Sequence, residues 1–404
     1  MLSLEVVRMA KVFSDLIKEV TTPGYCLACG ACVASCPFEC LEMKGGTPAL
    51  KKACINCGIC YDECPQVIDS RQLEQKIFGR RASDEEVFGI YQRALSVEAR
   101  SPDIKASAQD GGAVTALLAS LLEGGFIDGA IVMGVGSLPW QPTPMVATVR
   151  KELIECAGTK YAMGPLFLGL RDAVDLHYCS RVAVVGTPCQ IIASRRMQLS
   201  QLTNRRLGGT ITLRLGLFCA HAFEYEKFYR GVIQNQLRTP LTEVVKFDSK
   251  RGRFIIYRRH KPRRELALEA VRRYVCSPCK VCMDFAAELA DISVGSEGSP
   301  LGRSTVLIRT QTGSEAFGIA QRFRELDVIE LEKVKPGIEA IRKASKEKKL
   351  KAAKEFQRLK MRLIDFQKKG ARVPKRHLPI WAQEKPSVPK EEESLEPIAE
   401  IRKL

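Results

Sequence analysis

The amino-acid sequence predicts an α+β protein in which a small cysteine-rich module precedes a larger α/β core and a C-terminal helix. A twelve-residue cysteine pattern occurs twice between residues 21 and 70. Short apolar runs then alternate with helix-like segments from 111 to 335, which is typical of an α/β core. A basic stretch with helical periodicity follows at 336–378. At 404 residues, 45% of them hydrophobic, the chain is long enough for two or three domains.

Residues 1–20 are expected to form a short amphipathic helix that leads into the cysteine-rich module. Charged residues are spaced through this segment, so we do not expect a signal peptide. No apolar run approaches the roughly 18 residues that a membrane-spanning helix needs. The 16 cysteines cluster at metal-ligand spacings and not as a disulfide framework. These observations predict a reducing, cytoplasmic compartment and no transmembrane segment.

Residues 21–70 carry the strongest chemical signal in the chain. Each repeat has the form Cys-x2-Cys-x2-Cys-x3-Cys-Pro, the pattern of bacterial 2[4Fe–4S] ferredoxins, in which three thiolates bind one cluster and the fourth binds the other. Paired CxxC units can also hold zinc, but two matched runs of four cysteines exceed the four ligands of one zinc ion. The expected ligand sets are Cys26, Cys29, Cys32 and Cys64 for one cluster, and Cys36, Cys54, Cys57 and Cys60 for the other.

Residues 71–110 are expected to form a polar connector with a helix around Asp84 to Leu95. The core at 111–335 is expected to alternate buried strands with helices. The predicted strands are Ala130–Val135, Val182–Gly186 and Ile211–Phe218, and the predicted helices are Ala113–Glu123 and Gly164–Val174.

A glycine pair opens a predicted helix in the segment Gln109-Asp110-Gly111-Gly112-Ala113-Val114-Thr115. Free backbone N–H groups and the positive end of the helix dipole would suit a pyrophosphate there. A plain turn is, however, the more common meaning of a lone Gly-Gly pair. Downstream, Lys160-Tyr161 could bring an ammonium group and a ring to a flavin, although these residues alone also fit a surface loop.

A third group of cysteines is spread along the core. Cys189 and Cys219 each follow a predicted strand, and a CxxC pair comes far downstream. Because cysteines at strand ends can converge with a distant CxxC at one edge of a sheet, these residues predict a third [4Fe–4S] cluster. Buried thiols are common in protein cores, so a structural role is the alternative, and we expect it for Cys40, Cys156 and Cys179. The predicted ligands are Cys189, Cys219, Cys279 and Cys282, with Cys276 in reserve.

Most of the formal net charge of +17 lies in the segment at 336–378. There Phe356, Leu359, Leu363 and Phe366 recur at helical spacing, which predicts a basic amphipathic helix. The simplest interpretation is a solvated face over a packed stripe. Docking onto an acidic partner or an anionic membrane surface is the alternative, and nucleic acid is not expected. Residues 379–404 are rich in proline and glutamate and predict an extended tail.

Taken together, these segments resemble the beta subunits of coenzyme F420 hydrogenases and dehydrogenases, a flavin and iron–sulfur family centred on archaea. The resemblance runs from Phe13 to about Pro379. It is carried by the order of several short segments, each of them weak alone. These are Gln109–Thr115, Lys160-Tyr161, Gly186-Thr187-Pro188-Cys189-Gln190, Gly216–Cys219, Cys279-x2-Cys282-x-Asp284 and Ala290–Gly295, followed by Gly298, Gly302 and Ser304-Thr305.

The resemblance implies an FAD in the α/β core beside the third cluster, and reduced coenzyme F420 as substrate. FAD can accept a hydride and release electrons singly to [4Fe–4S] clusters, so no side chain need act as acid or base. Gly186, Thr187, Pro188, Gly295 and Gly298 join the glycine pair, its neighbours and Lys160-Tyr161 as expected cofactor contacts. Lys160, Arg195 and Arg196 are candidates for the acidic tail of coenzyme F420.

The doubled ferredoxin module most resembles the electron-input subunit of membrane-associated F420H2:quinone or methanophenazine oxidoreductases. Such a subunit would work with coenzyme F420 and partner subunits at the inner face of the membrane. The alternatives are a beta subunit or adaptor of an F420-reducing hydrogenase, heterodisulfide reductase, formate dehydrogenase or sulfite reductase. A simple ferredoxin-type electron carrier without flavin is an alternative of another class.

Overall fold

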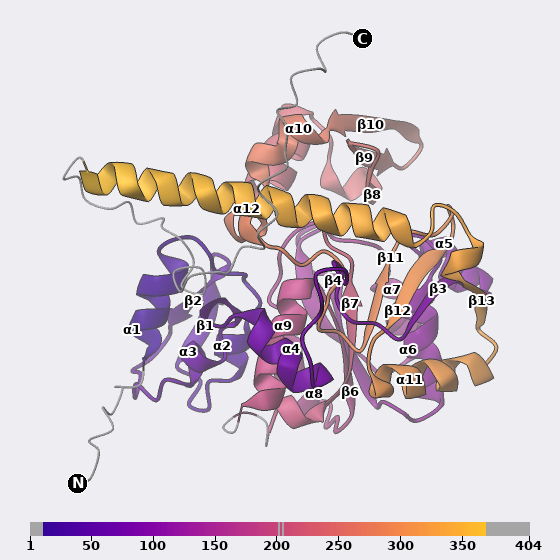
Figure 1. Ribbon diagram of the computed structural model, residues 1–404, viewed down its shortest axis with the longest axis horizontal. Helices are drawn as coiled ribbons and strands as arrows, with labels where there is room; N and C mark the ends of the chain where they lie inside the picture. The colour runs from indigo at the N-terminus through magenta and orange to yellow at the C-terminus, as the bar shows by residue number, and fades with distance from the viewer. Residues whose placement is uncertain (1–10, 201–202, 204–205, 369–404) are drawn as a thin grey trace.

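The computed structural model describes residues 11–200, 203 and 206–368, and it mixes helices and sheets as the sequence predicts. Figure 1 shows the cysteine-rich module beside the α/β core, with a long helix, α12 (Ile338–Lys368), lying across both. Within the described residues, no helix is both long and apolar enough to cross a membrane. The expected tail at 379–404 lies outside the described residues.

The cysteine-rich module is built from short elements, because each cysteine run must turn tightly around its sulfurs. Gly30 and Gly58 precede the two short helices of the repeats with φ of 79° and 81°, a left-handed conformation that glycine adopts at little cost. The repeated glycine therefore makes the same turn in each run. The elements are α1 (Phe13–Leu16), η1 (Ile17–Thr21), α2 (Ala31–Ala34), β1 (Leu41–Lys44), β2 (Thr47–Leu50), α3 (Ile59–Asp62) and η2 (Pro65–Val67).

The connector differs from the sequence expectation. Its helix is α4 (Ser70–Phe78), capped by the side chain of Asp69, and no helix forms around Asp84 to Leu95. Residues 93–99 instead form β3 (Arg93–Ala99), which pairs with two strands more than 200 residues downstream. The core sheet therefore begins within 71–110, and only these distant partners make the segment a strand.

An eight-stranded mixed sheet forms the core, in the order β13-β3-β12-β11-β7-β6-β4-β5. Its four central strands, β4, β6, β7 and β11, are parallel, so their carboxyl ends meet at one edge. This edge positions the residues that follow each strand. The bounds are β4 (Gly129–Val135), β5 (Pro142–Ala147), β6 (Val182–Gly186), β7 (Ile211–Leu217), β11 (Ile292–Gly295), β12 (Ser304–Ile308) and β13 (Leu326–Glu330).

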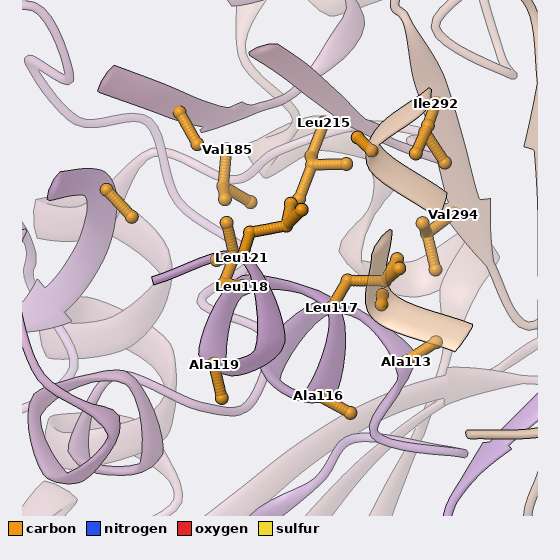
Figure 2. Close-up of a cluster of buried hydrophobic side chains, with 14 of the residues drawn as sticks. Ala113, Ala116, Leu117, Leu118, Ala119, Leu121, Val185, Leu215, Ile292 and Val294 are labelled. Carbon is orange, nitrogen blue, oxygen red and sulfur yellow. The ribbon is translucent and has the colours of Figure 1, made fainter. Parts of the chain in front are cut away.

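Helices cover both faces of this sheet. Figure 2 shows Leu117, Leu118 and Leu121 of α6 packed toward Val185 and Leu215 of the sheet. Each such buried leucine contributes about 1.5–3 kcal/mol. The opposite face, which carries Val182 and Val184, packs against α8 and α9. The helices of the core are α5 (Pro102–Ser107), α6 (Ala113–Glu123), α7 (Arg150–Glu155), α8 (Leu168–Asp175), α9 (Pro188–Leu199) and α11 (Gln311–Arg322), with a turn of η3 at Gly208–Thr210.

The cysteine-rich module is fixed to the core on the α8 and α9 side. The backbone N–H of Phe167 donates to the carbonyl of Cys29 at 3.0 Å, and Cys29 packs in the same apolar cluster as the sheet residue Val184. Gly30 faces Pro165 so closely that an added Cβ would lie 3.2 Å from the proline side chain. The module and the core therefore share buried surface.

A second, three-stranded antiparallel sheet lies against the core, and its separate fold was not predicted from the sequence. Phe223, Phe228, Phe247 and Phe254 stack beneath it in one aromatic cluster. Its elements are β8 (Val244–Lys250), β9 (Arg253–Arg258) and β10 (Lys261–Ala267), flanked by η4 (Tyr225–Gln236), η5 (Leu241–Glu243), α10 (Leu268–Val271), η6 (Arg272–Tyr274) and η7 (Ser277–Val281).

After η8 (Leu331–Lys333), α12 packs along the core by its N-terminal half. Ile341, Ser345 and Ala352 are buried at helical spacing. The expected stripe lies farther along, where Phe356 and Leu359 are half-buried and the side chains of Leu363 and Phe366 lie outside the described residues. A packed stripe beneath a basic, solvated face is thus present over the first half of the helix.

A buried ion network ties the sheet to its helices. The Asp291 carboxylate accepts a hydrogen bond from Arg195 at 2.7 Å, from the Arg214 backbone N–H at 2.9 Å and from the Thr310 hydroxyl at 2.8 Å. Burial alone would raise the pKa of Asp291, but Arg195 and Arg214 outweigh it and lower that pKa. Asp291 is therefore the counter-charge of two arginines in the core.

We predict that Asp291→Ala lowers the free energy of unfolding by about 3–5 kcal/mol, because it leaves two buried guanidinium groups without a counter-charge. In the control variant Glu339→Ala, the exposed Arg342 loses its partner, and the change should stay below about 1 kcal/mol. Anaerobic urea denaturation of both variants measures the difference. Similar losses in the two variants would contradict the role given to Asp291.

Candidate electron-transfer site

The structure brings the four cysteines of the first expected set around a single cavity. Cys26, Cys29, Cys32 and Cys64 line it together with apolar side chains that include Leu16, Val20 and Met43. Burial raises the pKa of the Cys64 thiol to about 12, with a further rise from the neighbouring Cys26. Thiols held this close in an apolar shell ionise only beside a compensating positive charge, which the iron ions of a cluster can supply.

The second expected set also converges, nearer to the surface. Burial raises the pKa of Cys60 to about 12, and Cys54, Cys57 and Cys36 raise it further. Cys57 is exposed and Cys54 half-buried, whereas Cys36 and Cys60 are buried. The set therefore opens to solvent on the side of Cys57.

The spacing of these thiols also bears on the zinc alternative. Across 11–200, 203 and 206–368, no three His, Cys, Asp or Glu side chains lie closely enough to hold a single metal ion. Zinc needs its ligands gathered around one centre. An iron–sulfur cube instead takes one thiolate at each of its iron corners, so it suits more widely spaced sulfurs.

The third set forms at the carboxyl edge of the sheet. Cys189 follows β6, Cys219 follows β7, and Cys279 and Cys282 come from the η7 loop. Burial raises the pKa of Cys189, and the nearby Cys282 and Cys219 add to the rise. The thiol of Cys279 accepts a hydrogen bond from the backbone N–H of Ala222 at 3.4 Å. The four predicted residues thus face one another.

The reserve cysteine lies behind this set. Its backbone N–H donates to the carbonyl of Ala222 at 2.9 Å, and Cys219 is the thiol that raises the pKa of Cys276 beyond the effect of burial and of Glu224. Cys189 and Cys282 interact with Cys279 instead. The geometry favours Cys279 over Cys276 as the ligand.

A lysine of α12 closes the third set, and it was not predicted from the sequence. The Lys348 ammonium donates to the carbonyls of Cys219 and Asp284 at 2.6 and 2.7 Å. Burial opposes its charge, but Cys282, Cys219 and Cys279 outweigh burial and raise the pKa of Lys348. The only sequence signal was its place on the helical stripe of Ile341 and Ser345.

The segments proposed for the flavin converge next to the second sheet. The Gln109 side chain accepts from the Thr159 backbone N–H at 3.2 Å and donates to the Phe247 carbonyl at 3.1 Å. Lys246 donates to the Gln109 carbonyl at 2.6 Å, and Lys250 pairs with Asp110 at 2.9 Å. Residues far apart in the chain thus form one polar corner.

Lys246, Asp248 and Lys250 belong to this corner but were missed in the sequence. Lys250 pairs with Asp248 at 3.1 Å as well as with Asp110. The missed signal was the alternation of Lys246, Asp248 and Lys250 along β8, which places charged residues on one face of a strand. These residues become candidates only once β8 is known to lie against the loop at 109–112.

The glycine pair is required by packing within the chain. An added Cβ at Gly111 would lie 2.5 Å from the Val97 carbonyl and 2.6 Å from the Ser304 nitrogen. Gly112 has a φ of 74° and caps α6, which buries Thr115. The turn interpretation accounts for these glycines, and the N-terminus of α6 remains available as a phosphate site only in our proposal.

Lys160 and Tyr161 lie at the same corner. The Lys160 ammonium donates to the carbonyls of Cys156 and Ala157 at 2.6 and 3.0 Å, and burial lowers its pKa to about 8. Tyr161 packs edge-on against Phe254, and burial raises the pKa of its hydroxyl. Lys160 therefore interacts with the C-terminal end of α7 in this structure.

The remaining predicted contacts follow β6 and β11. Thr187 caps α9 after Gly186 and before Pro188, and its backbone N–H donates to Gln190 at 2.9 Å. Gly295 ends β11, and Gly298, with a φ of 101°, approaches Thr305. All of them lie along the edge that carries Cys189 and Cys219.

The two arginine candidates are separated from this corner. Arg195 is bound to Asp291 in the core and is not available to a ligand. Burial lowers the pKa of Arg196, whose neighbours are Glu63 and Cys64 of the cysteine-rich module. The proposed role of these arginines in binding the acidic tail of coenzyme F420 is therefore corrected for Arg195, because its guanidinium is already paired.

Comparison with known families matches three parts of the chain. Residues 179–336 match the C-terminal part of the family described as "Coenzyme F420 hydrogenase/dehydrogenase, beta subunit", and residues 94–171 match its N-terminal part. Residues 8–81 match a 4Fe-4S dicluster domain. The two beta-subunit matches cover the sheet and the edge that carries the third cysteine set.

Several curated proteins are similar to the chain. The beta subunit of coenzyme F420 hydrogenase from Methanosarcina barkeri is 38% identical over 260 residues, covering 64% of this chain and 89% of the relative. The F-type subunit of F(420)H(2) dehydrogenase from Methanosarcina mazei is 29% identical over 358 residues, covering 84% and 94%. A protein of the F420-reducing [NiFe] hydrogenase complex from M. barkeri superposes with a TM-score of 0.67 at 36% identity, covering 72% of this chain and 99% of that one.

Proposed function

This chain belongs to the coenzyme F420 hydrogenase/dehydrogenase beta-subunit family, and on that premise we propose that it oxidises reduced coenzyme F420 through FAD and delivers electrons singly to a partner protein. Its curated relatives are F420-linked oxidoreductase subunits. The observation that carries the proposal is the placement of three cysteine sets in contact, from the core edge to the surface.

The residues present fit these groups. Three sets of four thiols would each hold a [4Fe–4S] cluster. The corner formed by Gln109, Asp110, Lys160, Tyr161 and the loop after β11 would hold FAD, whose bound ring would supply the exchange between a hydride and single electrons. Lys246 and Lys250 fix this corner through their bonds to Gln109 and Asp110, and the aromatic cluster beneath β8 excludes water. No side chain is assigned a proton transfer.

The order of the three sets supports a direction of flow. Cys189 of the third set interacts with Cys29 of the first, and Cys32 of the first interacts with Cys60 of the second. Cys57 of the second set is exposed. The sets therefore form a continuous series that starts beside the proposed flavin corner and ends at the molecular surface.

The extent of the similarity bears on which complex the chain serves. The match to the F(420)H(2) dehydrogenase relative spans 84% of this chain and 94% of that protein, whereas the match to the hydrogenase relative spans 64% of this chain. This difference favours an electron-input role in a membrane-associated F420H2:quinone or methanophenazine oxidoreductase. Membrane contact would then run through partner subunits at the cytoplasmic face, and a beta subunit or adaptor of another F420 system is the alternative.

We predict about 12 irons and 12 acid-labile sulfides per chain after anaerobic purification, because three sets of four thiols each hold one cube. Cys279→Ser should reduce both values to about 8. Cys156→Ser, a buried cysteine outside the sets, should leave them unchanged. Iron and sulfide analysis measures both variants, and a wild-type value of eight would remove the third cluster.

We further predict that reduced coenzyme F420 bleaches the flavin absorption of the anaerobic protein and then that of the clusters, while NADH does not. The reason is that hydride transfer requires a donor ring held against the flavin in a fitted site. Stopped-flow spectroscopy with equal concentrations of the two donors measures this selectivity. Equal rates with NADH would contradict the proposed substrate, and a preparation without flavin absorption would favour a simple ferredoxin-type carrier.

A further inference from the structure

The ammonium group of Lys348 is the positive charge that α12 places beside the third cysteine set. Its two acceptors are the neutral carbonyls of Cys219 and Asp284, at 2.6 and 2.7 Å. The neighbouring lysines of the same helix differ, because Lys349 pairs with Glu288 at 2.9 Å and Lys351 pairs with Glu347 at 3.4 Å. The charge of Lys348 is therefore directed at the thiols and is not spent on a carboxylate in an ion pair.

The position of Lys348 links the two loops that carry the third set. Cys219 is itself a predicted ligand, and Asp284 follows the ligand Cys282 by two residues. Cys282, Cys219 and Cys279 are the thiols that interact most strongly with the ammonium. One side chain thus holds both loops and places a cation against three of the four sulfurs.

The potential of an iron–sulfur cluster depends on its net charge, on hydrogen bonding and on exposure to solvent. Reduction adds one negative charge, so a nearby cation stabilises the reduced form more than the oxidised form, and in a site shielded from water this effect is large. We propose that Lys348 is a positioning residue whose charge raises the reduction potential of the third cluster, so that this cluster accepts electrons from the flavin. This inference rests on the proposed function, because it requires that the third set holds a cluster.

The test uses the full-length, cluster-loaded protein with four variants. Lys348→Met removes the charge and the donor, Lys348→Gln keeps a donor without the charge, and Lys348→Arg keeps both. Lys351→Met is the matched control, because it removes an exposed lysine one turn away on the same helix. Iron content is measured first, and the EPR signal that is lost in Cys279→Ser identifies the third cluster for a potentiometric titration.

We expect Lys348→Met and Lys348→Gln to bind as much iron as the wild type and to make reduction of the third cluster at least tenfold less favourable. That change corresponds to a shift of about 59 mV to lower potential for a one-electron couple. Lys348→Arg and Lys351→Met should titrate within a small fraction of this shift.

Two results would overturn the proposal. A wild-type potential in Lys348→Gln would show that the side chain only ties the two loops together. An equal shift in Lys351→Met would show that any positive charge on α12 has the same effect. If Lys348→Met loses iron, the comparison of Lys348→Gln with Lys348→Arg decides, because both keep a donor and only arginine keeps the charge. Eight irons in the wild type would instead disprove the third cluster itself.

Discussion

A single backbone hydrogen bond, from Phe167 to the carbonyl of Cys29, lies at the centre of the interface on which the rest of the structure depends. Electrons can pass between the core and the cysteine-rich module only if the two are held at a fixed separation. Cys29 is both a predicted ligand and a member of the apolar cluster under β6, so ligand geometry and domain packing are set by the same residue. A loose linker between the two parts could not supply this constraint, whereas shared buried surface does.

Close-packed thiols impose a second constraint, which is the cost of charge in a dry interior. Burial raises the pKa of the cysteines in each set, and neighbouring thiols raise it further. The structure places one cation beside two of these sets, Lys348 at the third and Arg196 near Cys64 of the first. Both come from long helices that also pack against the core, so these charges are held by the fold and do not depend on mobile surface side chains.

The sequence predicted the parts of the protein whose signals are local. The cysteine spacing, the buried runs at β6 and β7, and the helix at Ala113–Glu123 each depend on neighbouring residues, and the structure has elements there. It did not predict β3, because that strand becomes one only beside β12 and β13. Lys348 and Lys250 were missed for the same reason, since their roles arise from helices and strands that pack far from their own position in the chain.

The gradient of exposure across the three sets has a consequence for how the protein would fail in air. Among the twelve candidate ligands, all within the described residues, Cys57 alone is exposed, while the third set lies at the core edge beneath α12. Exposed, reactive sulfur is where oxidation begins. On the proposed assignment, oxygen would reach the electron exit before it reaches the flavin corner. Oxygen damage would therefore first disconnect the protein from its partner while leaving hydride transfer in place, and the stranded electrons could then reduce more oxygen.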